Sequence, residues 1–325
     1  MRPVFSITLA AVYALTIRLL FGFFGEITGI MSIGLLVLSP FVVGYLTVIL
    51  LPKRKILSQS AAFFLPWLTS LLILVVTIFL DIEGSICWIM IFPLFAIFAG
   101  LGGLIAQGRR KRKSDIEDLE NYDEWTKPDS LKISVLILFP FVFGIVEGDR
   151  SLSKKEMVIT KSVVINATPA AVWKALGSIN EIAAAEKHAS FSGMLGFPSH
   201  LRTTLDTLAV GGTRMAYYEK GLYFTETIRK CEPEKLLVLD IKTDPLKIPP
   251  TVMDEHIVIG GKHVDILQDV YTLEQLPDGT SRLTLSSRFF INTPFNWYAG
   301  IWADYLMSDI LHEELNLIKA RAAKL

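Results

Sequence analysis

The chain has 325 residues, of which 51% are hydrophobic, and its formal net charge is zero because 32 Lys and Arg balance 32 Asp and Glu. This length accommodates two ordinary domains, and a positive mean hydropathy is unusual for a wholly soluble protein. The even charge balance excludes the basic footprint of a nucleic-acid-binding protein, and two cysteines exclude a disulfide framework.

Apolar residues dominate the first 147 positions. Residues 1–107 hold only eight charged side chains, and a helix needs about 20 apolar residues to cross the hydrocarbon core. Four stretches meet that length, namely residues 4–24, 27–51, 60–80 and 86–107. A fifth, residues 131–146, is shorter and contains Pro140, so it is either a span or an interfacial segment. The sequence therefore predicts an all-α transmembrane bundle of four or five helices over residues 1–147.

The first apolar stretch exceeds the apolar core of a signal peptide, and no small-x-small cleavage site follows it. We therefore expect an uncleaved helix. It carries Arg18, which either faces a partner or extends outward, towards Glu26. The four longer stretches hold no second charged residue, and no inverted repeat is visible, which disfavours a transporter.

The distribution of Lys and Arg in short loops predicts the orientation. Residues 53–55 and 109–113 (RRKRK) are basic, whereas the other two tight connections hold no Lys or Arg, so the N-terminus and both basic loops are expected in the cytoplasm. RRKRK beside a span is typical of a topology anchor or a contact with anionic lipid, rather than of a nucleic-acid site. Five spans would place the C-terminal part outside the cytoplasm, and four would place it inside. Seven Lys and Arg in residues 109–132, against four in 150–161, favour five spans in a multi-pass protein of the cell (inner) membrane.

Residues 148–156 form the expected linker, and residues 157–325 have the pattern of an α+β domain. A strand expected over Met157–Ile165 precedes Thr168, a helix N-cap, and Pro169 at the first helical position. Turn residues predict antiparallel hairpins between further strands, which are expected at residues 213–219, 222–231, 235–241, 252–259, 263–274 and 282–291. A long helix is expected over residues 295–323. Residues 190–210 fit no clear strand.

An antiparallel sheet wrapped around a long C-terminal helix is a helix-grip fold. The stretches VVINATPAAVWKAL, ETIRKCEPEKLLVLDI and NWYAGIWADYLMSDILHEELNLIKA resemble the START-like or SRPBCC superfamily, which includes polyketide cyclase/dehydrase, lipid-transport and Bet v 1-like proteins. The resemblance covers about residues 157–323. It implies an apolar cavity between the sheet and the last helix, and it implies no particular reaction, because the superfamily has no shared catalytic motif.

The final helix presents one broad apolar arc at 100° per residue, formed by Ala303, Leu306, Met307, Ile310, Leu311, Leu315, Leu317, Ile318 and Ala322. Asp304 and Glu314 fall in the same arc. Because a buried carboxylate needs a partner or a raised pKa, either residue would orient the polar end of a ligand or act as an acid or base. The alternatives are that Glu314 turns to solvent near the helix end, and that Asp304 interacts with the positive end of the helix in its first turn.

The candidate ligand-binding residues are Tyr217, Phe224, Trp302, Asp304, Met307 and Leu311, although aromatic residues in a small sheet are more often part of the core. Pairing across Gly260 and Gly261 would place His256 opposite Asp265, so Asp304 and His256 are the catalytic candidates. A surface cross-strand pair is the alternative for His256. The His and Cys spacing fits no metal site, so neither a metal nor a cofactor is expected. The loop over residues 244–253 is a candidate lid or membrane-touching loop.

We therefore expect a membrane-anchored START-like domain that binds a hydrophobic or lipid-like molecule near the bilayer surface. Its expected partners are membrane lipids and a hydrophobic small molecule, with no nucleic acid, and tethering would raise their local concentration. One alternative is a cyclase-, dehydrase- or hydrolase-type enzyme that uses Asp304, His256 or a tyrosine. Another is a ligand sensor or assembly protein that signals through the helices.

Overall fold

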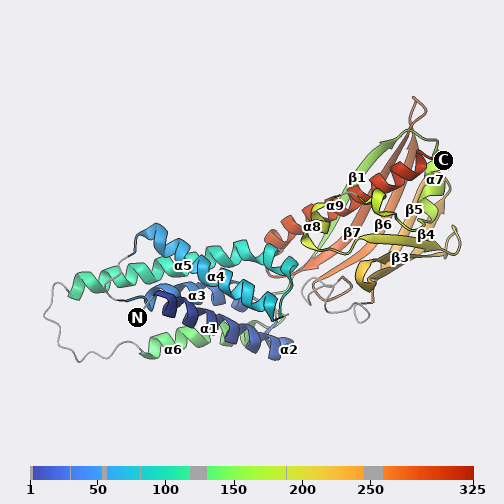
Figure 1. The fold of residues 1–325 in the computed structure, drawn as a ribbon. Coiled ribbons are helices and arrows are strands. Elements are labelled where there is room, and N and C mark those ends of the chain that lie inside the picture. Colours follow the sequence, from blue (N-terminus) through green and yellow to red (C-terminus); the bar gives the residue numbers. More distant parts are fainter. Residues whose placement is uncertain are drawn as a thin grey trace. The chain divides into compact units, whose positions relative to one another are not determined.

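The computed structural model describes residues 3–29, 31–52, 57–80, 82–117, 130–187, 189–244 and 259–325. The chain divides into two compact units, Met1–Leu152 (unit 1) and Ser153–Leu325 (unit 2). Unit 1 is helical and unit 2 is built on an antiparallel sheet (Figure 1).

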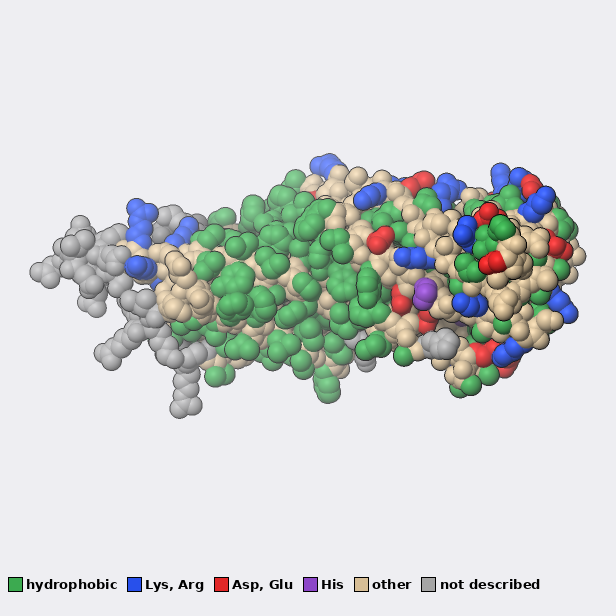
Figure 2. Space-filling model, turned by 90° about the horizontal axis from the view of Figure 1, so that it is seen from above, with side chains coloured by type: hydrophobic (Ala, Val, Ile, Leu, Met, Phe, Trp, Pro, Cys, Tyr) green, Lys and Arg blue, Asp and Glu red, His purple; other side chains and the backbone are tan. Residues whose placement is uncertain are grey.

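Unit 1 consists of apolar helices. They are α1 (Pro3–Phe23), α2 (Gly25–Thr28), the π-helix η1 (Gly34–Leu38), α3 (Ser39–Ile49), α4 (Gln59–Phe79), α5 (Ser85–Glu117) and α6 (Ser130–Glu147). Three helical stretches are long and apolar enough to cross a membrane, namely Val4–Phe23, Gln59–Phe79 and Ile86–Arg112. Hydrophobic side chains cover much of the visible face of unit 1, whereas charged side chains are spread over unit 2 (Figure 2). Unit 1 therefore has the composition of a membrane-associated bundle.

The prediction of four long spans and a shorter fifth is confirmed only in part. The stretch over residues 27–51 is not one helix, because α2 ends at Thr28 and the next residue, Gly29, has a φ of 65°, which is not helical. Helix resumes near Ile33, where the buried carboxylate of Glu147 accepts hydrogen bonds from the backbone N–H groups of Ile33 and Gly34 at 2.8 and 3.1 Å. The remaining apolar helix of this stretch, Gly34–Ile49, is shorter than the three full-length candidates. The fifth stretch forms α6, whose part Val135–Glu147 is also short, as the sequence predicts.

Small residues allow the helices of unit 1 to pack closely. A Cβ atom on Gly44 of α3 would lie 1.8 Å from the carbonyl oxygen of Ala99, and a Cβ atom on Gly102 of α5 would lie 1.9 Å from that of Phe41. Close backbone approach of this kind is a common means of association between apolar helices, because lipid provides no hydrophobic driving force between them. The α3 and α5 backbones are therefore in direct contact.

Several polar side chains inside unit 1 are paired across helices. The hydroxyl groups of Thr47 on α3 and Thr69 on α4 lie 3.0 Å apart, and Trp88 donates a hydrogen bond to the Thr77 hydroxyl at 2.7 Å. Arg18 on α1 forms an ion pair with Glu83, in the connection between α4 and α5. The expected partner Glu26 is thus replaced by a residue far along the chain, which sequence spacing alone does not reveal.

Unit 2 contains a seven-stranded antiparallel sheet in the order β1-β7-β6-β5-β4-β3-β2. The strands are β1 (Lys154–Ile165), β2 (His200–Leu205), β3 (Thr213–Tyr218), β4 (Tyr223–Glu232), β5 (Leu236–Lys242), β6 (Val264–Gln275) and β7 (Ser281–Asn292). Its helices are α7 (Pro169–Gly177), α8 (Phe191–Leu195), α9 (Asn296–Ala322) and the short turns η2 (Ala184–Glu186) and η3 (Glu219–Gly221). An antiparallel sheet with a long C-terminal helix is the arrangement that the sequence predicts for this part.

The start of unit 2 follows its local sequence signals. The Thr168 side chain accepts a hydrogen bond from the backbone N–H of Ala171, and Pro169 opens α7, as expected for an N-cap followed by proline. The expected strand over residues 252–259 lies outside the described residues, apart from Ile259, which forms an isolated bridge with Val264. The unassigned stretch 190–210 contains α8 and β2.

The core of unit 2 lies between α9 and the concave face of the sheet (Figure 1). α9 packs against β1 and β7. Leu311, Leu315 and Ile318 of α9 are buried in one cluster with Leu283 and Phe289 of β7. The sheet and the helix thus bury their apolar faces against each other, and the remaining space between them forms the cavity described next.

Candidate functional site

A cavity of about 640 Å³ lies between α9, α8 and strands β2, β3, β4 and β6. Much of its wall is apolar, with contributions from Phe197, Ala216, Leu222, Phe224, Ile266, Leu285, Leu311 and Leu317. Its size falls within the range of ligand pockets, roughly 300–1,000 Å³. The cavity is therefore large enough for a sizeable organic molecule.

Alternation along β3 and β4 directs two charged side chains into this apolar space. Side chains of a strand point alternately to opposite faces, so Arg214 shares a face with Ala216, and Glu226 shares one with Phe224. The register pairs Arg214 with Glu226 and Ala216 with Phe224. All four residues line the cavity, which gives an ion pair beside an apolar wall.

Arg214 and Glu226 form a buried ion pair. Arg214 is only 1% exposed, and its Nε lies 3.1 Å from Oε2 of Glu226. Burial alone would lower the pKa of Arg214, but the charge of Glu226 and the neighbouring Tyr271 raise it above the ordinary value. Burial raises the pKa of Glu226, and the charge of Arg214 opposes this rise. Arg214 is therefore a permanent cation in this cavity.

Asp269 of β6 completes the polar part of the wall. Burial raises the pKa of Asp269 from 3.8 to about 7, although a side-chain hydrogen bond with Ser287 opposes this shift. The ring of Tyr271, two residues along the same strand, lies 5.9 Å from the guanidinium carbon of Arg214. Arg214, Glu226, Asp269 and Tyr271 are called the polar cluster below.

Several atoms of the polar cluster have no hydrogen-bond partner among the described residues. They are Nε and Nη1 of Arg214, Oε2 of Glu226 and Oδ1 of Asp269, all shielded from bulk solvent. The Arg214 Nε is close to Glu226 but does not point at it well enough to form a hydrogen bond. A buried polar atom without a partner is costly, so each such atom calls for an explanation. The wall of the cavity thus holds both donors and acceptors that other described groups leave without a hydrogen bond.

A second polar group in the wall connects β2 to α9. His200 Nδ1 lies 3.1 Å from Oε2 of Glu314, and His200 Nε2 lies 2.8 Å from the hydroxyl of Thr203. The imidazole stacks on the ring of Tyr218 with centroids 4.9 Å apart. Burial would raise the pKa of Glu314, but the charge and hydrogen bond of His200 lower it below its ordinary value. Glu314 is therefore ionised beside the imidazole.

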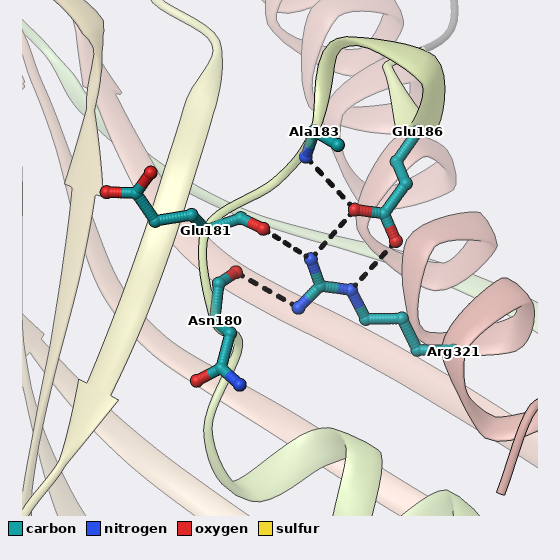
Figure 3. Close-up of polar contacts among 5 residues, drawn as sticks. All are labelled: Asn180, Glu181, Ala183, Glu186 and Arg321. Atoms are coloured by element: carbon teal, nitrogen blue, oxygen red, sulfur yellow. Dashed lines mark hydrogen bonds and ion pairs between the residues drawn. The ribbon is translucent and has the colours of Figure 1, made fainter.

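Arg321, near the end of α9, fixes a segment that borders the cavity (Figure 3). Its guanidinium donates to both carboxylate oxygens of Glu186, at 3.2 and 3.0 Å, and to the carbonyl oxygens of Asn180 and Glu181 at 3.0 and 3.1 Å. Glu186 also accepts from the backbone N–H of Ala183 at 3.1 Å. The hydrogen bonds with Arg321, its largest influence, lower the pKa of Glu186. This side of the cavity is therefore held by charge-assisted hydrogen bonds.

The structure places the predicted site residues in different environments. Phe224 and Leu311 line the cavity, and Met307 is buried in the main core. Tyr217 points away from Arg214 and Ala216, and the guanidinium of Arg202 lies 4.9 Å from its ring centroid. Trp302 is half-buried on α9. Of these residues, the structure brings together only Phe224 and Leu311 at the cavity.

The structure corrects the prediction that Asp304 lies on the buried face of the final helix. Its side chain is exposed, whereas Glu314, the other carboxylate of the predicted arc, lines the cavity and binds His200. The first turns of α9 extend past the part of the helix that covers the cavity, so a position within the apolar arc is not necessarily buried. His256, the other catalytic candidate, lies outside the described residues.

Sequence reasoning missed Arg214, Glu226 and Asp269, and it missed His200 as the partner of Glu314. The alternation along residues 213–219 and 222–231 could have indicated Arg214 and Glu226, because each lies on the same face of its strand as apolar residues. Recognising that they form a pair also requires the strand register, which places one opposite the other. In the described residues, no group of three His, Cys, Asp or Glu side chains could hold a metal ion. The expected absence of a metal or cofactor stays a prediction.

No protein-family model and no curated protein matches this sequence. Solved structures similar to part of the chain include the ZhuI aromatase/cyclase from Streptomyces sp. R1128, with 11% identity, TM-score 0.34, and coverage of 52% of this chain and 95% of that one. A START superfamily protein from Mycobacterium smegmatis has 9% identity and TM-score 0.34, and the match covers 51% of this chain and 97% of that one. Truncated norcoclaurine synthase from Thalictrum flavum has 13% identity and TM-score 0.32, and the match covers 51% of this chain and 93% of that one. The neighbours are START-like and Bet v 1-like proteins, but similarity at this level identifies neither a ligand nor a reaction.

Proposed function

We propose that unit 2 binds an amphipathic, lipid-like molecule in its cavity, with the apolar part against Phe224, Leu311 and their neighbours and a polar group at the polar cluster. One observation carries this proposal. Arg214, Glu226 and Asp269 place one cation and two carboxyl groups in the wall of an otherwise largely apolar cavity. A ligand group that is both an acceptor and a donor, such as a hydroxyl or a protonated acid, would complement these side chains.

The ligand's polar group is expected to be small and at most singly charged. The polar cluster holds one guanidinium and two carboxyl groups, and the Asp269 pKa of about 7 leaves that carboxyl partly protonated near neutral pH. A head group with several negative charges would be repelled by the carboxylates, and one with several positive charges would be repelled by Arg214. The proposal therefore favours molecules with one hydroxyl, carbonyl or carboxyl end.

Anchoring in a membrane forms the second part of the proposal. Unit 1 contains three helices with the length and composition of membrane spans. Residues 1–147 would act as the anchor, and the linker would be residues 148–153, shorter than the expected 148–156 because β1 begins at Lys154. Such an anchor keeps unit 2 close to a source of apolar ligands and raises their effective concentration. The resemblance of residues 157–323 to START-like proteins supports this function at the level of the fold.

Mass spectrometry of molecules that co-purify with the full chain tests the proposal. The wild type is expected to retain an amphipathic compound. Ala216→Phe, which places a ring in the cavity, should lose it. Tyr217→Ala changes the next residue of the same strand on the opposite face and serves as the matched control. Equal retention by all three proteins would contradict binding in this cavity.

A second candidate function is hydrolysis or acyl transfer. Thr203, His200 and Glu314 form a chain of hydroxyl, imidazole and carboxylate, with distances of 2.8 and 3.1 Å. This is the order of groups that activates a hydroxyl nucleophile. Thr203→Val keeps the shape and removes the hydroxyl, so it should abolish turnover of a p-nitrophenyl acyl ester without loss of the co-purifying molecule. Absence of turnover by the wild type, or equal turnover by the variant, would exclude this candidate.

A further inference from the structure

Unit 2 has an exposed apolar stripe on the first half of α9. Trp297, Ile301 and Tyr305 follow one another at intervals of four residues, which places them on one side of a helix. Their exposed fractions are 65%, 64% and 55%. Large apolar side chains that stand exposed in a row mark an interaction surface more often than single ones do.

The stripe continues onto α8 and reaches the edge of the cavity. The ring of Phe191 packs edge-on against that of Tyr305, with centroids 4.8 Å apart. Met194, also on α8, is 81% exposed and belongs to the residues that line the cavity. Met194, Trp297, Ile301 and Tyr305 are called the aromatic face below. This face adjoins the cavity rim.

Chain connectivity limits how far the start of α9 can lie from the last apolar helix. The Asn296 side chain donates a hydrogen bond to the carbonyl oxygen of Ser153. Ser153 follows Glu147, the end of α6, by six residues, and six residues span at most about 20 Å. The aromatic face therefore begins beside Ser153, which the chain keeps within about 20 Å of the end of α6.

The chemistry of the aromatic face fits the boundary between headgroups and hydrocarbon. Tryptophan and tyrosine are enriched at this boundary. Lys154 and Lys155 are exposed, and Nζ of Lys155 would lie 3.8 Å from a Cβ atom on Gly300, so a cation lies beside the face. Asp304 is exposed on the same part of α9 and offsets that positive charge. Binding would therefore rest on apolar insertion rather than on attraction to anionic lipid.

We propose that the aromatic face docks on the surface of the bilayer that anchors the chain, with Trp297, Ile301 and Met194 inserted at the headgroup level. The cavity rim then opens at the membrane surface. If the cavity binds an amphipathic molecule, as proposed above, that molecule can move between bilayer and cavity without crossing water. Only this last consequence rests on the proposed function.

Spin-label accessibility in the full chain, reconstituted into phosphatidylcholine vesicles, tests the docking. A nitroxide is attached to Ile301→Cys, or to Lys319→Cys as a control on the same helix, in a chain that carries Cys87→Ala and Cys231→Ala. At position 301 the label should collide with dissolved oxygen several-fold more than with a water-soluble nickel chelate, and at position 319 the preference should reverse. Adding phosphatidylglycerol should change neither result.

Two results would overturn the proposal. Equal accessibility at both positions would show that the face is in water, and an immobile label shielded from both reagents would show that protein covers it, from unit 1 or a second copy.

Quenching by brominated phosphatidylcholine gives a second measurement with both cysteines retained. Trp297→Phe should reduce the quenched fraction of tryptophan fluorescence, whereas Trp173→Phe should leave it unchanged or raise it. Loss of the co-purifying molecule has a separate readout, so failure of docking and failure of ligand binding remain distinguishable.

Discussion

Arg214 illustrates how one residue can depend on its strand partner. It is almost completely withdrawn from solvent, and Glu226, opposite it on β4, supplies the compensating charge. Replacing a whole buried ion pair by neutral groups is often tolerated, but removing one member leaves an uncompensated charge. The pair therefore contributes to stability mainly through the cost of breaking it.

The first prediction concerns this pair. Arg214→Met should lower the free energy of unfolding by about 3–5 kcal/mol, because Glu226 is left buried without its cation. The double variant Arg214→Met/Glu226→Gln should recover a large part of that loss. Thermal and chemical unfolding of both single variants and the double variant gives the coupling energy. Additive losses would show that the two side chains do not interact energetically.

The second prediction concerns pH and Asp269. Its pKa is about 7 in the folded protein and 3.8 is its ordinary value, so the folded state holds the proton more tightly. The stability that this proton provides is present below pH 4 and is lost as the pH rises through about 7. Asp269→Asn removes this titration. The difference in melting temperature between variant and wild type should therefore move in favour of the variant from pH 5 to pH 8. A constant difference would contradict the raised pKa.

At the scale of elements, contact between helices in unit 1 depends on the absence of side chains. Gly44 and Gly102 lie where a Cβ atom would collide with a carbonyl oxygen of the neighbouring helix. A carbonyl oxygen belongs to the backbone, so the collision cannot be relieved by a side-chain rotation. α3 and α5 would have to separate.

The third prediction follows from this contact. Gly102→Ala should destabilise the full chain in detergent by about 1–3 kcal/mol, as overpacking does. Gly108 lies on the same helix with no atom within 4 Å of an added Cβ, so Gly108→Ala is the matched control. Alanine favours helix over glycine, and the control should be neutral or stabilising by up to about 1 kcal/mol. Equal melting temperatures for the two variants would argue against the close approach of α3 and α5.

At the scale of the whole molecule, unit 2 contains a complete hydrophobic core of its own. The largest buried cluster draws its residues from β1, α7, β4 to β7 and α9, all within residues 153–325. An independent core is the main requirement for independent folding.

The fourth prediction is that residues 153–325, expressed alone, fold cooperatively as a soluble monomer. Leu176→Ala in this fragment, at a site 1% exposed, should lower its stability by about 2–5 kcal/mol. Calorimetry and sedimentation measure both properties. Exposed aromatic residues on α9 could cause association, so Ile301→Glu provides a second version of the fragment. Failure of both versions to fold would contradict the proposed boundary.

The fifth prediction concerns the side of the membrane on which unit 2 lies. The excess of Lys and Arg in residues 109–132 over residues 150–161 predicts that unit 2 is outside the cytoplasm. Protease added to right-side-out vesicles should then digest it. Complete protection, with digestion after the vesicles are opened, would place it in the cytoplasm.

Local features of this protein can be predicted from the amino-acid sequence alone. An N-cap threonine followed by proline defines the start of α7, and apolar stretches define α1, α4 and α5. These signals depend on a few adjacent residues or on one periodicity, so no contact with distant parts of the chain is needed to recognise them. For the same reason, five of the six strands predicted in residues 213–291 lie within a residue or two of those observed.

Which charged residues meet depends on the tertiary structure. The pairs Arg214–Glu226, His200–Glu314 and Arg18–Glu83 join different strands, a strand and a helix, or a helix and a loop. The break at Gly29 also escaped prediction, because hydropathy counts apolar residues and carries no information on backbone dihedral angles. Asp304 and Glu314 lie in the same apolar arc, yet one is exposed and the other is covered, since burial depends on how far each turn of α9 extends over the sheet. That extent is a property of the packed domain and not of the helix.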